Sequence, residues 1–123
     1  MINKFLVKSY THQIEKFQSE DKELINTTYY ENDLIKRQLW KTENDKTLLD
    51  CYSENNFLYR KFYQFDKEHS LDIFLTDEGY LSEIVYHKYE HYLHLEFDDK
   101  GKFLRSSKAN LNDKRYNNIK KSN

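Results

Sequence analysis

The sequence predicts a mainly β protein of the α+β class, an eight-stranded antiparallel meander of four hairpin repeats with an N-terminal helix packed on the sheet. The first observation behind this prediction is an internal repeat, because four stretches are near-copies of one another. They are YYENDLI from Tyr29, YSENNFL from Tyr52, LTDEGYL from Leu75 and FDDKGKF from Phe97. Their starts lie 23, 23 and 22 residues apart, so the unit is one hairpin of about 23 residues.

Each copy has the residue types of a tight hairpin turn. An acid is followed two positions later by a residue that accepts positive φ at little cost. The acids are Glu31, Glu54, Asp77 and Asp99, and the positive-φ positions are Asp33, Asn56, Gly79 and Gly101. We expect a three-residue loop, a type I turn followed by a left-handed residue, in which the acids accept backbone N–H groups. This assigns the acids a structural role in place of a catalytic or calcium-binding one.

A turn of this kind also predicts a strand register. If pairing is symmetric about Asn32, the strands meet as Tyr29 with Ile35 and Thr27 with Arg37. The same construction pairs Tyr52 with Leu58, Asp50 with Arg60, Leu75 with Leu81, Ile73 with Glu83, Phe97 with Phe103 and Leu95 with Arg105. One row further from the turns it pairs Ile25 with Leu39, Leu48 with Phe62 and Leu71 with Val85. Partners in such a ladder share one face of the sheet, and that face is apolar except for a polar central row.

The polar row and the opposite face supply the candidate binding residues. The row contains Arg37, Asp50, Arg60, Glu83 and Arg105, and an Arg–Asp–Arg ladder is expected across Arg37, Asp50 and Arg60. The opposite face is expected to carry Trp40, Phe57, Tyr59, Tyr63, Phe74, Tyr80 and Tyr86, mixed with Lys36, Lys61 and Asp72. Aromatic residues beside charges are typical of protein interfaces, and also of any half-exposed sheet. The candidate partner-binding residues are Trp40, Tyr59, Tyr63, Tyr80, Tyr86, Arg37, Asp50, Arg60 and Glu83.

The N-terminal segment has helical periodicity, with apolar residues three or four positions apart at Ile2, Leu6, Tyr10, Ile14 and Phe17. A sheet with one apolar face needs a cover, and this helix can supply it; the alternative is a further strand over residues 3 to 9. We therefore expect one domain over 1–107, with a helical segment at 1–22 and the sheet at 23–107. Residues 108–123 are expected to form a basic polar tail, frayed or disordered.

Bulk composition narrows the class of protein. The chain is 33% charged but 16% aromatic, which favours a folded domain over a disordered one. Cys51 is the only cysteine, and the start lacks a signal-peptide pattern, so we expect a cytoplasmic protein without a membrane span. Residues 100–123 hold eight Lys or Arg and one acid, a net of +7, which leaves −8 for residues 1–99. An acidic body disfavours nucleic acid and attracts basic surfaces.

No motif for catalysis is present: there is no phosphate-binding glycine loop, no GxSxG and no HExxH. His87, His91 and His94 would be adjacent on a helix, but the repeat places them at a link between hairpins and on the following strand. With His94 facing away from Leu93 and Leu95, they make a poor metal site. We therefore expect neither an enzyme nor a cofactor nor a bound metal.

Phrases such as YYENDLIKRQLW and FDDKGKFLRS resemble MORN-type repeats and, more closely, bacterial hairpin-repeat proteins described as YwqK-family antitoxins; they also resemble the YD repeats of toxin shells. The resemblance covers residues 25 to 107. MORN units usually carry two glycines, whereas here Asp33 and Asn56 replace one and the other is absent. The resemblance implies a small immunity or antitoxin-type inhibitor that neutralises a toxin through protein–protein contact, and the acidic body of the chain suits a basic partner.

Two alternatives remain open at this point. The meander could curl into a closed barrel that holds a small ligand, or the basic tail could serve an anti-defence inhibitor directed at nucleic acid. An open meander would also leave edge strands that could pair two chains into a homodimer.

Overall fold

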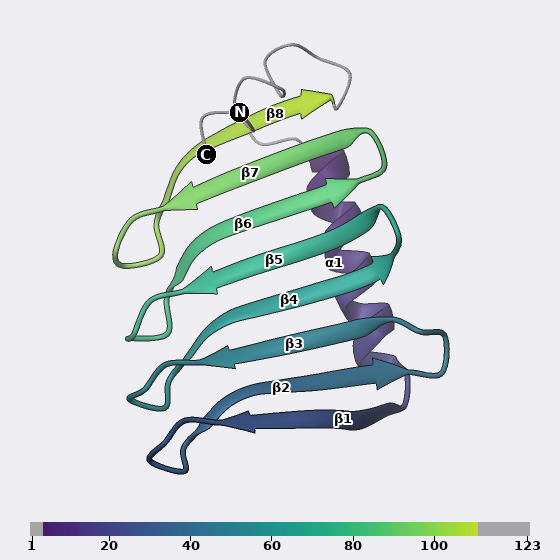
Figure 1. Ribbon diagram of the computed structural model, residues 1–123. Coiled ribbons are helices and arrows are strands. Elements are labelled where there is room, and N and C mark those ends of the chain that lie inside the picture. Colours follow the sequence, from purple (N-terminus) through teal and green to yellow (C-terminus); the bar gives the residue numbers. More distant parts are fainter. Residues whose placement is uncertain (1–3, 111–123) are drawn as a thin grey trace.

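The computed structural model describes residues 4–110, which form one helix and one eight-stranded sheet. The helix α1 spans Lys4–Ser19. The strands are β1 Lys22–Tyr29, β2 Ile35–Thr42, β3 Thr47–Tyr52, β4 Leu58–Asp66, β5 His69–Leu75, β6 Leu81–Lys88, β7 His91–Phe97 and β8 Phe103–Asn110. They are hydrogen-bonded in sequence order, and every pair is antiparallel. The predicted meander with its N-terminal helix is confirmed (Figure 1).

The four hairpin turns lie at one end of the strands, and the links between hairpins lie at the opposite end (Figure 1). Asp33, Asn56, Gly79 and Gly101 have φ values of 67°, 65°, 90° and 82°, so the predicted left-handed positions are confirmed. The expected role of the turn acids is wrong, because the side chain that accepts the backbone N–H groups usually lies one position earlier. These acceptors are the Ser53 and Thr76 hydroxyls and the Asp98 carboxylate, while the turn acids are exposed.

A β-bulge that recurs in every hairpin changes the register. The first pair beyond each turn is as predicted, Tyr29 with Ile35 for example, but the next pair is Thr28 with Arg37 in place of Thr27 with Arg37. One extra residue therefore sits in the second strand of every hairpin: Lys36, Tyr59, Ser82 and Leu104. Such a β-bulge moves all later residues of that strand to the other face. The predicted faces are right for β3, β5 and β7, and in the second strands β2, β4, β6 and β8 they are wrong for the residues beyond the bulge.

The core is a ladder of alternating aromatic and leucine side chains. Directly paired across six strands are Trp40, Leu48, Tyr63, Leu71, Tyr86 and Leu93. Leu71 and Leu93 are fully buried, and Tyr63 and Tyr86 are 3% and 1% exposed. The ladder repeats every two strands because the sequence repeats every hairpin.

Helix α1 covers this ladder by lying across the strands, behind the sheet in Figure 1. Phe17 meets the ring of Tyr63 edge-on with centroids 5.3 Å apart, and Tyr10 meets Tyr86 in the same way at 5.6 Å. Seven helical residues rise about 10.5 Å, and two strands are about 9.6 Å apart. One heptad of the helix therefore matches one hairpin of the sheet, which explains why positions seven apart contact equivalent aromatic residues.

The helix ends where Lys22 binds its last carbonyl groups. The Lys22 ammonium donates to the backbone oxygens of Phe17, Gln18 and Glu20 at 3.0–3.3 Å. A cation at this end also interacts favourably with the helix dipole. The chain then turns directly into β1.

The sheet is open, because β1 and β8 are edge strands that do not pair with each other. The closed barrel on which the ligand-binding alternative depends is therefore not formed. Strand β8 continues to Asn110, so the predicted boundary at residue 107 is three residues too early. The rest of the predicted basic tail lies outside the described residues. Within residues 4–110, α1 is neither long nor apolar enough to cross a membrane.

Candidate protein-binding face

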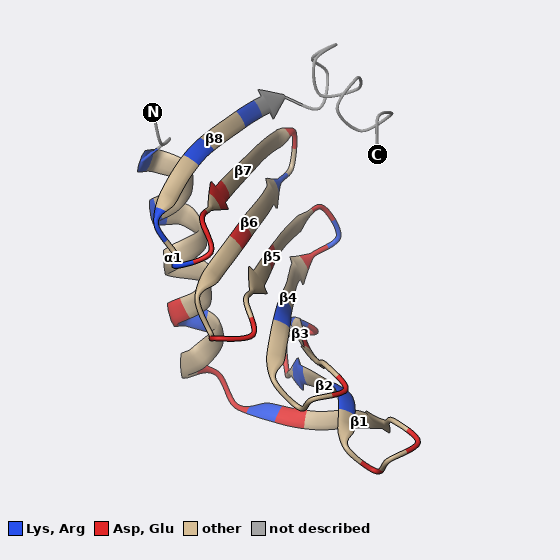
Figure 2. Ribbon diagram, turned by 90° about the vertical axis from the view of Figure 1, so that its left-hand side faces the viewer, with Lys and Arg blue, Asp and Glu red and all other residues tan. Residues whose placement is uncertain are grey.

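The face of the sheet opposite α1 has no cover among the described residues, and Figure 2 shows the helix on one side only. We call this surface the open face. Two of its rows run across the sheet from β2 to β8, and every neighbouring pair within a row is a direct cross-strand pair. The row nearer the hairpin turns is Arg37, Cys51, Arg60, Phe74, Glu83, Glu96 and Arg105; the next is Leu39, Leu49, Phe62, Asp72, Val85, His94 and Ser107.

Arg60 is the centre of the open face. Its Nε and Nη2 atoms donate to the two carboxylate oxygens of Asp72 at 2.8 and 2.6 Å, a fork-shaped pair that fixes the guanidinium plane. Its Cζ atom also lies 5.2 Å from the ring centroid of Phe62 and 5.4 Å from that of Phe74. The side chains of Arg60 and Asp72 are 34% and 16% exposed. The hydrogen bond from Asp72 raises the pKa of Arg60.

A second cluster of charges lies over β6, β7 and β8. The His94 Nε2 atom is 2.9 Å from Glu83 Oε1, and His94 Nδ1 is 3.8 Å from Glu96 Oε1. Arg105 hydrogen-bonds Glu96 and lowers the pKa of that carboxyl. These side chains hold one another in place, so the open face presents oriented charges between half-buried apolar groups.

Cys51 lies in the same row and is 4% exposed. Burial raises the pKa of its thiol, against the opposing influence of Arg60 and Arg37. A buried, protonated thiol is a poor nucleophile. Cys51 therefore acts here as a small apolar residue.

The bulges divide the predicted binding residues between two faces. Arg37, Arg60, Glu83 and Arg105 share one row as predicted, but that row lies on the open face and not on the helix-covered face where it was expected. Asp50 stays on the helix side, where it pairs with Lys61, so the predicted Arg–Asp–Arg ladder is wrong. Arg60 takes its carboxylate from Asp72 of the next hairpin instead.

Trp40, Tyr63 and Tyr86 lie on the helix side as members of the core ladder or packed against it, so their predicted place beside Phe74 is wrong. Tyr59 is a bulge residue, 38% exposed, and Tyr80 follows a turn, 42% exposed. Phe62, Val85 and Leu39 were expected on the apolar face and are on the open face. One sequence signal could have revealed this: aromatic residues recur at 40, 63 and 86, in phase with leucines at 48 and 71.

A polar network crosses from α1 to the sheet beneath this face. Lys88 Nζ donates to Ser9 Oγ at 3.0 Å, and Ser9 Oγ lies 2.8 Å from Tyr86 Oη. Tyr86 Oη lies 2.5 Å from His69 Nε2, and His69 Nδ1 lies 3.9 Å from Asp66. Since an ammonium can only donate, Lys88 donates to Ser9, and further hydrogen bonds join Ser9 to Tyr86 and Tyr86 to His69. Every member then has a partner, which anchors the helix in one position.

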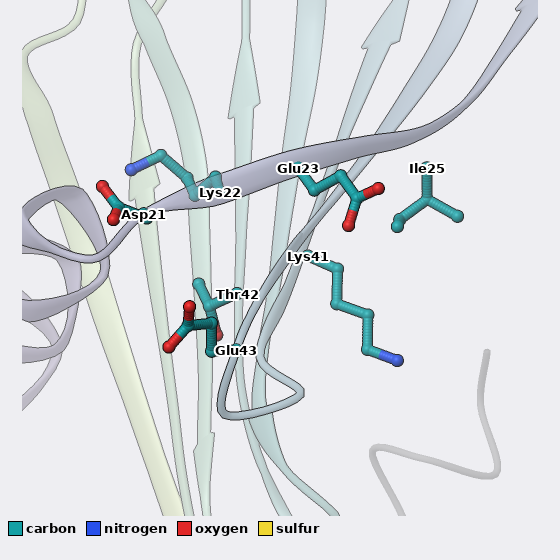
Figure 3. Close-up of a pocket in the computed structure, with 7 residues that line it drawn as sticks. All are labelled: Asp21, Lys22, Glu23, Ile25, Lys41, Thr42 and Glu43. Atoms are coloured by element: carbon teal, nitrogen blue, oxygen red, sulfur yellow. The ribbon is translucent and has the colours of Figure 1, made fainter.

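A surface hollow of about 350 Å³ lies between the segment that leads from α1 into β1, the strand β1 itself and the end of β2 with its following link (Figure 3). Its charged walls are Asp21, Lys22, Glu23, Lys41 and Glu43. Lys22 is engaged with the helix carbonyl groups, and Lys41 with Asp45 at 3.1 Å. Both lysines of the walls are therefore engaged, and the other charged groups are the carboxylates of Asp21, Glu23 and Glu43. This combination does not match a recognisable class of ligand.

The predicted histidine placement is confirmed: His87 and His91 flank the β6–β7 link, and His94 faces away from buried Leu93 and Leu95. No group of metal-ligating side chains of sufficient size gathers in residues 4–110. No protein-family model, curated protein or solved structure matches this chain.

Proposed function

We propose that this protein is a small cytoplasmic inhibitor of the immunity or antitoxin type, which neutralises a toxin by binding it through the open face. The observation that carries the proposal is the contrast between the two faces of one sheet. One face is packed by α1, whereas the other holds Phe62 and Phe74 half-buried around an oriented arginine. Aromatic residues and arginine are the types most enriched at the centres of protein interfaces.

The rigidity of this surface supports the same proposal. Arg60, Asp72, Glu83 and His94 are held by direct ion pairs and hydrogen bonds on neighbouring strands. A surface whose side chains are already ordered loses little conformational entropy when a partner binds. A meander of hairpins provides such a surface on neighbouring strands.

The charge distribution favours a basic partner. Residues 1–99 carry a net charge of −8, and Figure 2 shows acidic residues at several of the turns. Opposite net charge accelerates the encounter of two proteins. The resemblance to YwqK-family antitoxins points to the same class of partner, a toxin.

The test is inhibition of the product of a neighbouring gene. Purified protein should bind that product at a one-to-one ratio, abolish its toxicity on co-expression, and bind faster at low salt than at high salt. Phe74→Ser should weaken the complex by about a hundredfold or more, as expected for an interface centre. Phe5→Ser is the matched control, since Phe5 lies on α1 and is 71% exposed. A complex that tolerates Phe74→Ser, or a neighbouring product that does not bind, contradicts the proposal.

A further inference from the structure

The internal repeat shows that one ion pair of the open face is incomplete. Arg37, Arg60, Glu83 and Arg105 occupy equivalent positions in the second strands of the hairpins, 23, 23 and 22 residues apart. In the two central cases the charge is matched by the next strand. Arg60 of β4 binds Asp72 of β5, and Glu83 of β6 binds His94 of β7.

The residues that provide these partners are equivalent as well. Asp72 and His94 lie 22 residues apart, and the position 23 residues before Asp72 is Leu49. Leu49 lies on β3 beside Leu39, as Asp72 lies on β5 beside Phe62. Between β2 and β3, Arg37 is therefore equivalent to Arg60, but Leu49 stands where a carboxylate equivalent to Asp72 would be.

Arg37 is exposed, and within residues 4–110 it forms no ion pair. A surface hollow of about 260 Å³ lies beside it. The walls of the hollow are Asn26, Thr28, Arg37, Leu39 and Leu49. Asn26 and Thr28 add an amide and a hydroxyl donor, and the two leucines add an apolar wall.

We infer that this hollow binds the carboxylate of an acidic side chain, Glu or Asp, from the protein partner. That carboxylate would take the place at Arg37 that Asp72 takes at Arg60. Arginine and carboxylate match as two parallel hydrogen bonds, and the methylene groups of the incoming side chain would contact Leu39 and Leu49. The inference rests on the proposed function, because it names the partner chemistry at one point of the same face.

A phosphate fits this hollow less well than a carboxylate does. Phosphate sites commonly combine several cations or a run of backbone N–H groups. Here one guanidinium stands with two neutral donors and an apolar wall. The geometry points to a ligand with one negative charge and an aliphatic stem.

The experiment uses the whole chain and a defined probe, N-acetyl-glutamate α-amide, which carries only the side-chain carboxylate. Titration followed by amide NMR should shift the signals of Asn26, Thr28, Arg37 and Leu39 to saturation, and N-acetyl-glutamine α-amide should shift none of them. Arg37→Gln should weaken binding of the probe by about tenfold or more, as for a lost charge-assisted hydrogen bond. Lys41→Gln, an exposed change on the same strand, should leave it unchanged.

A second variant completes the ion pair within the chain. Leu49→Asp introduces the residue found at the equivalent position of the next repeat, Asp72. Its carboxylate should pair with Arg37 and abolish binding of the probe, whereas Leu49→Asn should not. The amide spectrum of each variant reports whether it is folded. Equal shifts with the glutamine probe, saturation by dimethyl phosphate in preference to glutamate, or unchanged binding in Arg37→Gln would each overturn the inference. Because no toxin is used, these results stand apart from the test of the proposed function.

Discussion

At the scale of single residues, the open face is organised by Arg60 and the groups that orient it. The bidentate contact with Asp72 and the two flanking rings place its charge at the middle of the sheet. Because both side chains are partly shielded from water, this pair should contribute more than an exposed one.

Asp72→Asn is therefore expected to lower the free energy of unfolding by about 1 kcal/mol, through loss of the charge-assisted pair. The matched control is Asp45→Asn, which removes the partner of Lys41. Those two side chains are 82% and 45% exposed, so the change should lie within about 0.5 kcal/mol. Urea denaturation of the two variants measures the difference, and equal losses would contradict this view of the open face.

A second residue-scale prediction concerns His69 under the helix. Burial lowers the pKa of His69, with Lys88, His87 and Lys46 acting in the same direction and Asp66 opposing. The folded state thus binds fewer protons than the unfolded state, whose histidine has a pKa of about 6.5. The stability that depends on neutral His69 is present above that value and is lost as pH falls through the lower folded pKa.

The denaturation midpoint should accordingly fall between about pH 7.5 and about pH 5, and His69→Gln should reduce this dependence. His12→Gln, on the exposed side of α1, is the control and should retain it. A pH profile of His69→Gln that parallels the unsubstituted protein would show that other groups cause the effect.

At the scale of elements, α1 stabilises the sheet by fitting one heptad to one hairpin. Phe17→Ala should cost about 3–4 kcal/mol, because it opens a cavity under Tyr63 at a site that is 1% exposed. Phe5→Ala on the same helix should cost less than about 0.5 kcal/mol. Thermal or urea unfolding distinguishes the two, and similar losses would indicate that the helix is not docked as described.

The turns give an independent test at the same scale. At Gly79, with φ of 90°, an added Cβ meets no atom within 4 Å, so Gly79→Ala tests backbone strain alone. We expect a loss of about 1 kcal/mol. Asn56→Gly, at a φ of 65°, should be neutral or slightly stabilising, and calorimetry of both variants measures the contrast.

The elements also show which structural features the repeat could predict. The turns were predictable because Asp33, Asn56, Gly79 and Gly101 share a chemical requirement, tolerance of positive φ. The bulges were not, because Lys36, Tyr59, Ser82 and Leu104 share no residue type and the distortion is a backbone property. The missed bulges exchanged Trp40, Tyr63 and Tyr86 with Leu39, Phe62 and Val85. The candidate residues beyond the bulges were consequently assigned to the wrong face, although Arg37, Arg60 and Glu83 were correctly grouped with one another.

At the scale of the whole molecule, residues 4–110 form a single open sheet with one helix, and the two faces of the sheet differ in cover and composition. The helix side buries the aromatic ladder and the polar network from Lys88 to Asp66. The open face presents paired charges around Phe62 and Phe74, and Arg37 has no ion pair among the residues that the structure describes. Edge strands β1 and β8 carry exposed apolar residues, Leu24 and Leu104 among them, so self-association through an edge stays a prediction.

The central claim is that the open face, and not the helix side, binds the toxin. The most direct measurement is the dissociation constant of the purified complex for Phe74→Glu and Phe5→Glu, two charge insertions on opposite sides of the molecule. The account predicts that Phe74→Glu weakens the complex by about a hundredfold or more while Phe5→Glu leaves it unchanged. Equal affinity for both variants, or a larger loss in Phe5→Glu, would contradict it.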